Sequence, residues 1–322
     1  MLMPKNNALS QSRVLAHAID VGFIGSIFLA AYAAIYTDTT WEVVGAAWLV
    51  FILVGHLTNT SVSLYLHRAC THQPAVKFVH WLNGCFRTII YTTTGIASFE
   101  WCAIHFRHHS ENDKAGAVNS PASEGVICGT TTRSTPIARW EHILSKLLGG
   151  KCTEGFGVVV NNYRMYRKAA AEKAKIQEFL PYVKVPNDWF EKTFVHNKKL
   201  RSLGILLMLP VILVLVGYVT YAVPGLIAVL ILWPLILLWT IVSGGIINGV
   251  GHSAKEPSVL RHEGYSINIL PWSFTLNFLI CGENFHHGHH KRSTSWSFDR
   301  WDIGAFYIRV LQALKLAQAR PI

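Results

Sequence analysis

The sequence predicts an all-α integral membrane protein, with four transmembrane helices and a cytosolic helical cap that carries a histidine-rich di-metal site. Three observations support this fold class. Of the 322 residues, 51% are apolar and only 15% are charged, which is unusual for a soluble domain. Three stretches, residues 21–37, 43–67 and 202–254, contain no charged side chain. Histidines, finally, recur in three closely spaced groups.

The uncharged stretches define the expected spans. A helix needs about 20 mostly apolar residues to cross the hydrocarbon of a bilayer. The third stretch is long enough for two helices, and Pro224-Gly225 near its middle predicts a tight turn between them. We therefore expect spans at about 19–37, 43–66, 202–223 and 226–248. Residues 75–101 are interrupted by Lys77 and Arg87 and are read as interfacial or cytosolic.

Basic residues predict the orientation. Two precede the first span, nineteen lie between His67 and Arg201, eight follow Ala254, and none lies in the two short connectors. By the positive-inside tendency, both termini and the cap, residues 67–201 and 249–322, face the cytosol. No internal repeat is present, so residues 1–322 are read as one domain. The net charge of +11 follows either from this topology alone or from an acidic partner or substrate headgroup. No nucleic-acid-binding motif accompanies it, so we expect membrane lipids and not nucleic acid as a partner.

Two cytosolic segments show helical patterns. Residues 162–179 read as a basic amphipathic helix. Apolar residues at helical spacing between positions 302 and 319 predict a last helix that packs back on the cap.

The histidine groups lie at residues 67–72, 105–109 and 286–290. The second and third contain His-x-x-His-His, whose histidines share one face of a helix. In the first group, His67 and His72 would lie roughly 140° apart on a regular α-helix, so we expect the helix to end or bend between them. His252, just after the last expected span, lies at the same level. The nine candidate metal ligands are His67, His72, His105, His108, His109, His252, His286, His289 and His290.

This ligand set favours a pair of redox metal ions. One metal ion accepts four to six ligands, so nine imidazoles imply two ions, and zinc sites seldom gather so many histidines. Iron fits better. Carboxylate-type di-iron proteins use paired Glu-x-x-His motifs, whereas only one, from Glu283 to His286, occurs near these groups. We expect Glu283 to orient an imidazole by accepting its N–H. A histidine-rich metal transporter is the remote alternative, because transport sites lie near the bilayer midplane and not at helix ends.

The three histidine groups, residues 248–252 and the run from Trp301 to Leu311 together resemble the membrane-bound fatty acyl desaturases of the acyl-CoA type, over most of the chain. The resemblance implies a mushroom-shaped fold and two iron ions held by the nine histidines, with Asn248 reaching a metal through water. Asp113 matches an acidic position of the family. The implied reaction uses O2 as co-substrate and leaves a double bond in a fatty acyl chain. An acetylenase that forms an alkyne, a terminal-alkene-forming decarboxylase and a hydroxylase share this metal chemistry and stay open.

The resemblance is weaker at the positions that would contact the acyl chain and its carrier. It implies that Phe51 and Gly55 line the end of an acyl tunnel, and Tyr65 stands where the family has a small residue. Ala103-Ile104 replaces an Arg-Asp pair that contacts the nucleotide headgroup. The acyl carrier is therefore open between coenzyme A (CoA), acyl carrier protein and a lipid. An acidic carrier protein would suit a set of basic residues: Lys146, Lys151, Arg164, Arg167 and Lys168.

Electrons must come from a separate protein. The sequence has no haem-binding His-Pro-Gly-Gly and no dinucleotide-binding Gly-x-Gly-x-x-Gly. We expect a donor of the cytochrome b5, ferredoxin or rubredoxin type.

Overall fold

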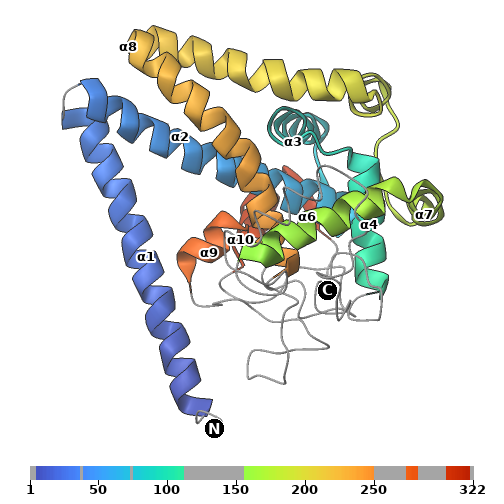
Figure 1. Cartoon of the computed structure of the whole chain (residues 1–322). Coiled ribbons are helices and arrows are strands. Elements are labelled where there is room, and N and C mark those ends of the chain that lie inside the picture. Colours follow the sequence, from blue (N-terminus) through green and yellow to red (C-terminus); the bar gives the residue numbers. More distant parts are fainter. Residues whose placement is uncertain are drawn as a thin grey trace, which may run out of the picture.

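The computed structural model of the protein describes residues 5–36, 39–72, 75–111, 156–249, 273–281 and 302–319. Within these ranges the chain is mostly helical, as predicted (Figure 1). The elements in chain order are α1 (Lys5–Tyr36), α2 (Thr39–Ser61), the π-helix η1 (Val62–Thr71), β1 (Val76–Phe78), α3 (His80–Thr93), α4 (Ser98–Glu111), α6 (Phe156–Ala171), α7 (Lys173–Phe179), the 3₁₀-helix η2 (Leu180–Tyr182), the π-helix η3 (Glu191–Val195), α8 (Lys198–Gly244), the π-helix η4 (Gly245–Gly249), α9 (Phe274–Leu279), α10 (Ile303–Ala313) and β2 (Ala317–Ala319).

Three described helical segments are long and apolar enough to cross a membrane: Arg13–Tyr36, Thr40–Thr71 and Val223–Asn248. They correspond to three of the four expected spans. Their large apolar side chains face outward, as in Phe28 at 70% and Leu29 at 71% exposure, which suits lipid and not water. The expected span at 202–223 forms the first arm of α8, where the side chains of residues 215–222 lie outside the described part, so that span stays a prediction.

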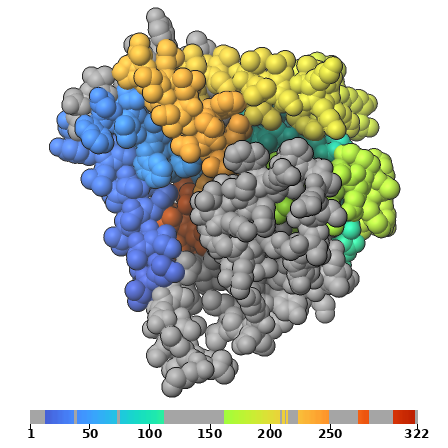
Figure 2. Space-filling model, in the orientation of Figure 1, coloured from blue at the N-terminus to red at the C-terminus, as the bar shows by residue number. Residues whose placement is uncertain are grey.

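The membrane helices lie side by side. Figure 2 shows α1 and α2 next to each other, with the second arm of α8 against α2. At the α1–α2 contact a Cβ added to Gly45 would come within 2.9 Å of the Ala34 backbone nitrogen, so only glycine permits this approach. Figure 1 shows α8 changing direction sharply between its yellow and orange arms. Pro224 lies inside this helix, lacks an N–H, and explains the bend near its middle.

The cap begins where α2 continues into η1. Residues 75–101 form β1, α3 and the start of α4, and no candidate span was found in them, as predicted. A buried apolar cluster joins η1, β1 and α10 through Leu66, Val76 and Ile308. Strand β2 pairs antiparallel with β1, with Val76 opposite Ala319. The predicted last helix, α10, therefore packs on η1 and leads into the strand that pairs with β1, while a cytosolic cap stays a prediction.

A buried ion pair connects the first histidine group to this last helix. Arg68 Nη2 donates to both Asp302 carboxylate oxygens, at 3.1 and 3.2 Å, and the two side chains are 5% and 1% exposed. Asp302 also caps α10, because its Oδ1 accepts the backbone N–H of Ala305 at 2.9 Å. Asp302 thus fixes both the start of α10 and the position of η1.

Gly304 is expected to tolerate no side chain beside this pair. A Cβ at this position would lie 2.9 Å from both Arg68 Nη2 and the Cys281 carbonyl oxygen. Replacing Gly304 with Ala should therefore lower the unfolding free energy by about 1–3 kcal/mol, as overpacking of a buried site does. Thermal unfolding of the solubilised protein measures this effect. The matched control is Gly84→Ala on α3, where nothing lies within 4 Å of an added Cβ. Equal unfolding temperatures for the two variants would contradict the expectation.

Candidate metal site

The first histidine group lies on a π-helix. We expected the helix to end or bend between His67 and His72, and it does end there, at Thr71, with His72 as its C-cap. The sequence did not predict that the helix first widens into a π-helix, in which the His72 backbone N–H donates to the His67 carbonyl oxygen at 3.1 Å. Hydrogen bonds between residues five apart place those residues above one another, so both imidazoles share a face. Their ring centroids lie 4.7 Å apart.

Side chains around η1 support its wide winding. Thr71 Oγ1 donates to the Leu66 carbonyl oxygen at 2.8 Å, and the buried thiol of Cys102 on α4 donates to the same oxygen at 3.5 Å. The Leu66 carbonyl oxygen thus accepts hydrogen bonds from two side chains. The π-helix therefore depends on its neighbours as well as on its own sequence.

The second histidine group lies on α4 and faces the first. As predicted, His105 and His109 share one helix face: their ring centroids lie 4.6 Å apart and their Nε2 atoms 2.9 Å apart. The His67 ring lies 4.4 Å from that of His105. His108 on the same helix is fully buried, with its ring 5.4 Å from that of His109.

Four of these side chains form a cluster that fits a metal ion. One ligand atom from each of His67, His72, His105 and His109 lies within 4.8 Å of the others. Nitrogens bound to one ion at about 2.1 Å are at most about 4.2 Å apart, so small side-chain rotations suffice to close the set. No acidic residue belongs to this cluster in the described part of the chain. The described cluster therefore consists of imidazoles alone, and its members are four of the nine predicted ligands.

Other predicted site residues lie outside the described residues. They are His252, His286, His289, His290, Glu283, Asp113, Lys146 and Lys151. The set for a second ion therefore stays a prediction. Asn248 is described, at the end of η4, and its Oδ1 is buried with no hydrogen-bond partner among the described residues. It borders the same small cavity as His67 and His105, and its role near a metal stays a prediction.

Trp101 supports the cluster, and our sequence interpretation missed it. Its ring stacks on that of His105, with centroids 4.5 Å apart and an interplanar angle of 8°. The signal was available, because Trp101 precedes His105 by four residues and so lies on the same helix face. This stacking restricts the orientation of one proposed ligand.

Two cavities border the cluster. The larger, of about 400 Å³, lies between α4, α6 and the two arms of α8, with His105 and Trp101 in its wall. The smaller, of about 80 Å³, is bordered by both His67 and His105. Trp101, Thr240 and Asn248 contribute to both, so the cavities are neighbours.

The residues predicted to line an acyl tunnel lie elsewhere. Phe51 packs against the second arm of α8, with Trp239 at 6.2 Å between ring centroids. A Cβ added to Gly55 would also meet Trp239, at 3.1 Å. Tyr65 is 3% exposed and borders a space of only about 10 Å³. None of the three borders the two cavities above, and their tunnel role stays a prediction.

Helices α6 and α7 cover the positions where the sequence departs from the family pattern. Ala103 and Ile104 are 1% and 3% exposed and pack against Ala169 and Ile176. Side chains buried in this way have no access to a carrier at the surface. Of the basic residues on α6, Arg167 and Lys168 are exposed and Arg164 is half-buried. Arg167 and Lys168 are therefore accessible to an acidic partner.

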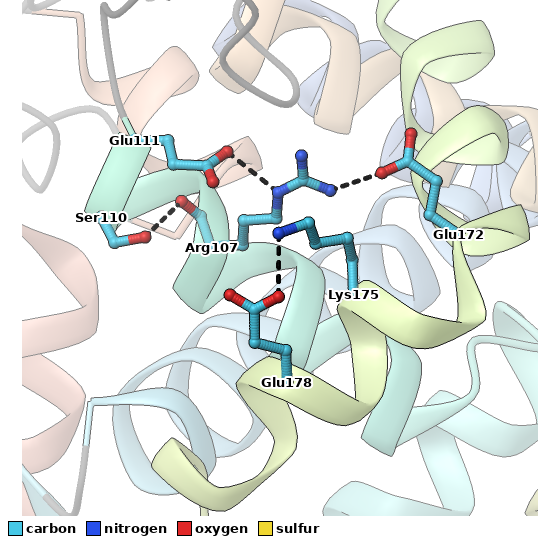
Figure 3. Close-up of polar contacts among 6 residues, drawn as sticks. All are labelled: Arg107, Ser110, Glu111, Glu172, Lys175 and Glu178. Carbon is cyan, nitrogen blue, oxygen red and sulfur yellow. Dashed lines mark hydrogen bonds and ion pairs between the residues drawn. The ribbon is translucent and has the colours of Figure 1, made fainter.

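An ion-pair bridge holds α7 on α4 (Figure 3). Arg107 donates to Glu111 at 2.9 Å and to Glu172, just before α7, at 2.7 Å. Burial disfavours its charge, but the hydrogen bonds to Glu172 and Glu111 outweigh this effect and raise the pKa of Arg107. The guanidinium therefore stays charged and keeps the cover over Ala103 and Ile104 in place.

A second polar network fixes the start of α4. Arg87 donates to both carboxylate oxygens of Asp188 at 2.7 Å, and the hydrogen bond from Arg87 lowers the pKa of Asp188 to about 2. Glu191 is buried, and burial raises the pKa of its carboxyl group although Ser98 and Arg87 oppose the shift. Ser98, the first residue of α4, donates to Glu191 at 2.5 Å. This network connects α3 and η3 to the helix that carries His105.

Comparison with known proteins agrees with this geometry. The sequence model described as fatty acid desaturase matches residues 44–298. A search of curated proteins gave no match. The matched range covers all three histidine groups, including the four histidines of the described cluster.

Proposed function

Because the chain belongs to the fatty acid desaturase family, we propose that it is an O2-dependent membrane enzyme that introduces a double bond into a fatty acyl chain. The family implies an oxidoreductase that acts on fatty acyl substrates. The observation that carries the proposal is the buried cluster of His67, His72, His105 and His109, which borders two cavities. Such an arrangement brings a metal site to the wall of a substrate cavity.

The cluster accounts for one of two proposed iron ions. The five other predicted histidines, His108, His252, His286, His289 and His290, are then left for the second ion, with Asn248 acting through water. When bound, the iron pair supplies the dioxygen activation and the oxidation of the acyl chain. Glu283 and Asp113 are proposed to orient imidazoles by accepting their N–H groups.

The protein's own residues position the acyl chain and exclude water from it. Ile96, Ile104 and Leu237 supply apolar wall to the larger cavity, and Trp101 and His105 form its wall on the side of the cluster. An acyl chain held in this cavity presents one pair of adjacent carbons to the metal site. The protein thereby selects which carbons are oxidised. Closure of the cavity around the chain also prevents water from reaching the reacting carbons.

The carrier and the electron donor complete the proposal. The fatty acyl chain is presented on CoA, acyl carrier protein or a lipid at the proposed cytosolic face. Arg167 and Lys168 are exposed there. A separate cytochrome b5, ferredoxin or rubredoxin supplies the electrons. We propose that both termini and the metal site lie on the cytosolic side, and the distribution of basic residues supports this orientation.

Product analysis tests the proposal. The protein should be expressed in a host that lacks the activity, and one saturated acyl chain should be offered on CoA, on acyl carrier protein and in phospholipid. We expect a new double bond with at least one carrier. Hydroxylated, alkyne or shortened products without any new double bond would contradict desaturation and would identify the hydroxylase, acetylenase or decarboxylase reaction instead.

A further inference from the structure

The wall of the larger cavity is more polar than a plain alkyl chain requires. Asn162 on α6 and Thr240 on α8 contribute polar side chains to it, among apolar neighbours such as Ile241. The hydrocarbon part of a saturated acyl chain offers only methylene and methyl groups and forms no hydrogen bond with either side chain. These two residues therefore point to a different feature of the occupant.

Both side chains have a buried oxygen without a partner. Asn162 Oδ1 and Thr240 Oγ1 have no hydrogen-bond partner among the described residues, and Asn162 is only 6% exposed. Buried polar groups in native proteins are almost always hydrogen-bonded, so each exception calls for a missing partner. The buried hydroxyl of Thr58 on α2, in contrast, follows the rule. Thr58 Oγ1 donates to the Val54 carbonyl oxygen at 2.7 Å.

Both groups border the larger cavity beside the histidine cluster, and Asn162 approaches the α8 face on which Thr240 lies. Thr240 and Gly244 are one turn apart on α8, and a Cβ added to Gly244 would lie 4.0 Å from Asn162 Nδ2. The amide of Asn162 therefore lies near the α8 face that Thr240 and Gly244 share. Thr240 also borders the smaller cavity together with His67 and His105. The polar pair thus lies where the larger cavity approaches the proposed metal site.

We infer that this cavity binds an acyl chain that carries a hydroxyl group close to the oxidised carbons, with Asn162 and Thr240 as its hydrogen-bond partners. A hydroxyl group both donates and accepts, so it can satisfy an amide and a second hydroxyl together. A site built in this way discriminates against a chain without the hydroxyl, because its own polar groups are then left unpaired. The inference rests on the proposed fatty acyl oxidation and names its substrate class. Ordered water offers the same chemistry, and the experiment distinguishes the two sources.

The test compares acyl chains of one length that are plain or carry a hydroxyl group at successive positions. With the full-length protein in a membrane host, we expect one hydroxylated isomer to be oxidised at least ~10-fold faster than the plain chain. Thr240→Val and Asn162→Leu should each reduce this preference to about threefold or less, whereas Thr240→Ser, which keeps the hydroxyl, should retain it. The matched control is Thr58→Val, which removes a buried hydroxyl that does not border the cavity and should leave the preference unchanged.

Two results would overturn the inference: equal oxidation of plain and hydroxylated chains by the unmodified protein, or an unchanged preference in both Thr240→Val and Asn162→Leu. If Thr240→Val slows both kinds of chain by the same factor, the partner is ordered water, and the inference again fails. Oxidation of plain chains without preference would leave the proposed function intact. Oxidation of neither kind would contradict the proposed function itself.

Discussion

Replacing His105 with Ala is expected to lower turnover at least about 100-fold and to reduce the amount of bound metal. Loss of groups that only orient metal ligands already costs about 10–100-fold, so the loss of a ligand should cost at least as much. His105 is the central member of the cluster. Its Nε2 lies 2.9 Å from that of His109, its ring lies 4.4 Å from that of His67, and Trp101 stacks on its face.

The matched control for this variant is His80→Ala. His80 is the first residue of α3, is exposed, and belongs to no histidine cluster in the described part of the chain. It should leave turnover and metal content unchanged. Both variants should reach the membrane in equal amounts, as measured by quantitative immunoblotting of membrane fractions. Full turnover in His105→Ala at equal membrane levels would show that the assigned ligand set is wrong.

Replacing Asp302 with Ala is expected to have the largest effect on stability. It removes the carboxylate that accepts from Arg68 in the buried ion pair, and breaking a buried pair from one side typically costs about 3–5 kcal/mol. It also removes the side-chain cap of α10. Thermal unfolding of the solubilised protein should show a large fall in the unfolding temperature, and metal should be lost along with the position of η1.

The control is an ion pair on the surface. Lys175 and Glu178 on α7 pair at 2.8 Å, but their side chains are 47% and 54% exposed (Figure 3). Solvent screens such a pair, so Glu178→Ala should leave the unfolding temperature almost unchanged. A similar fall in both variants would mean that the Arg68–Asp302 pair contributes no more than a surface contact.

The sequence predicts those parts of the site whose geometry depends on the spacing of residues within one helix. The i, i+4 relation of His105 and His109 follows directly from helical periodicity, and the structure confirms that their rings meet. The same reasoning would have found Trp101. Apolar periodicity also predicts α10, and its buried Ile308 confirms that this helix packs on η1.

Reasoning from the sequence fails where distant segments set the geometry. The π-helix η1 is supported by the thiol of Cys102 and by the pairing of its own Arg68 with Asp302. Cys102 and Asp302 both lie far from η1 in the sequence. No helical periodicity encodes such contacts, so a regular helix with a break was the expected form. The larger cavity likewise arises where α4, α6 and both arms of α8 meet. Its polar residues, Asn162 and Thr240, therefore carry no signal of their own in the sequence.

The metal content of the purified protein tests the central claim most directly. The protein should be produced with ample iron, and the iron bound per chain should be measured by elemental analysis. The nine predicted histidines, four of which form the described cluster, require two iron ions per chain. Two ions per chain, reduced in His105→Ala and retained in His80→Ala, is the predicted result. Fewer than two bound ions under these conditions would contradict the account.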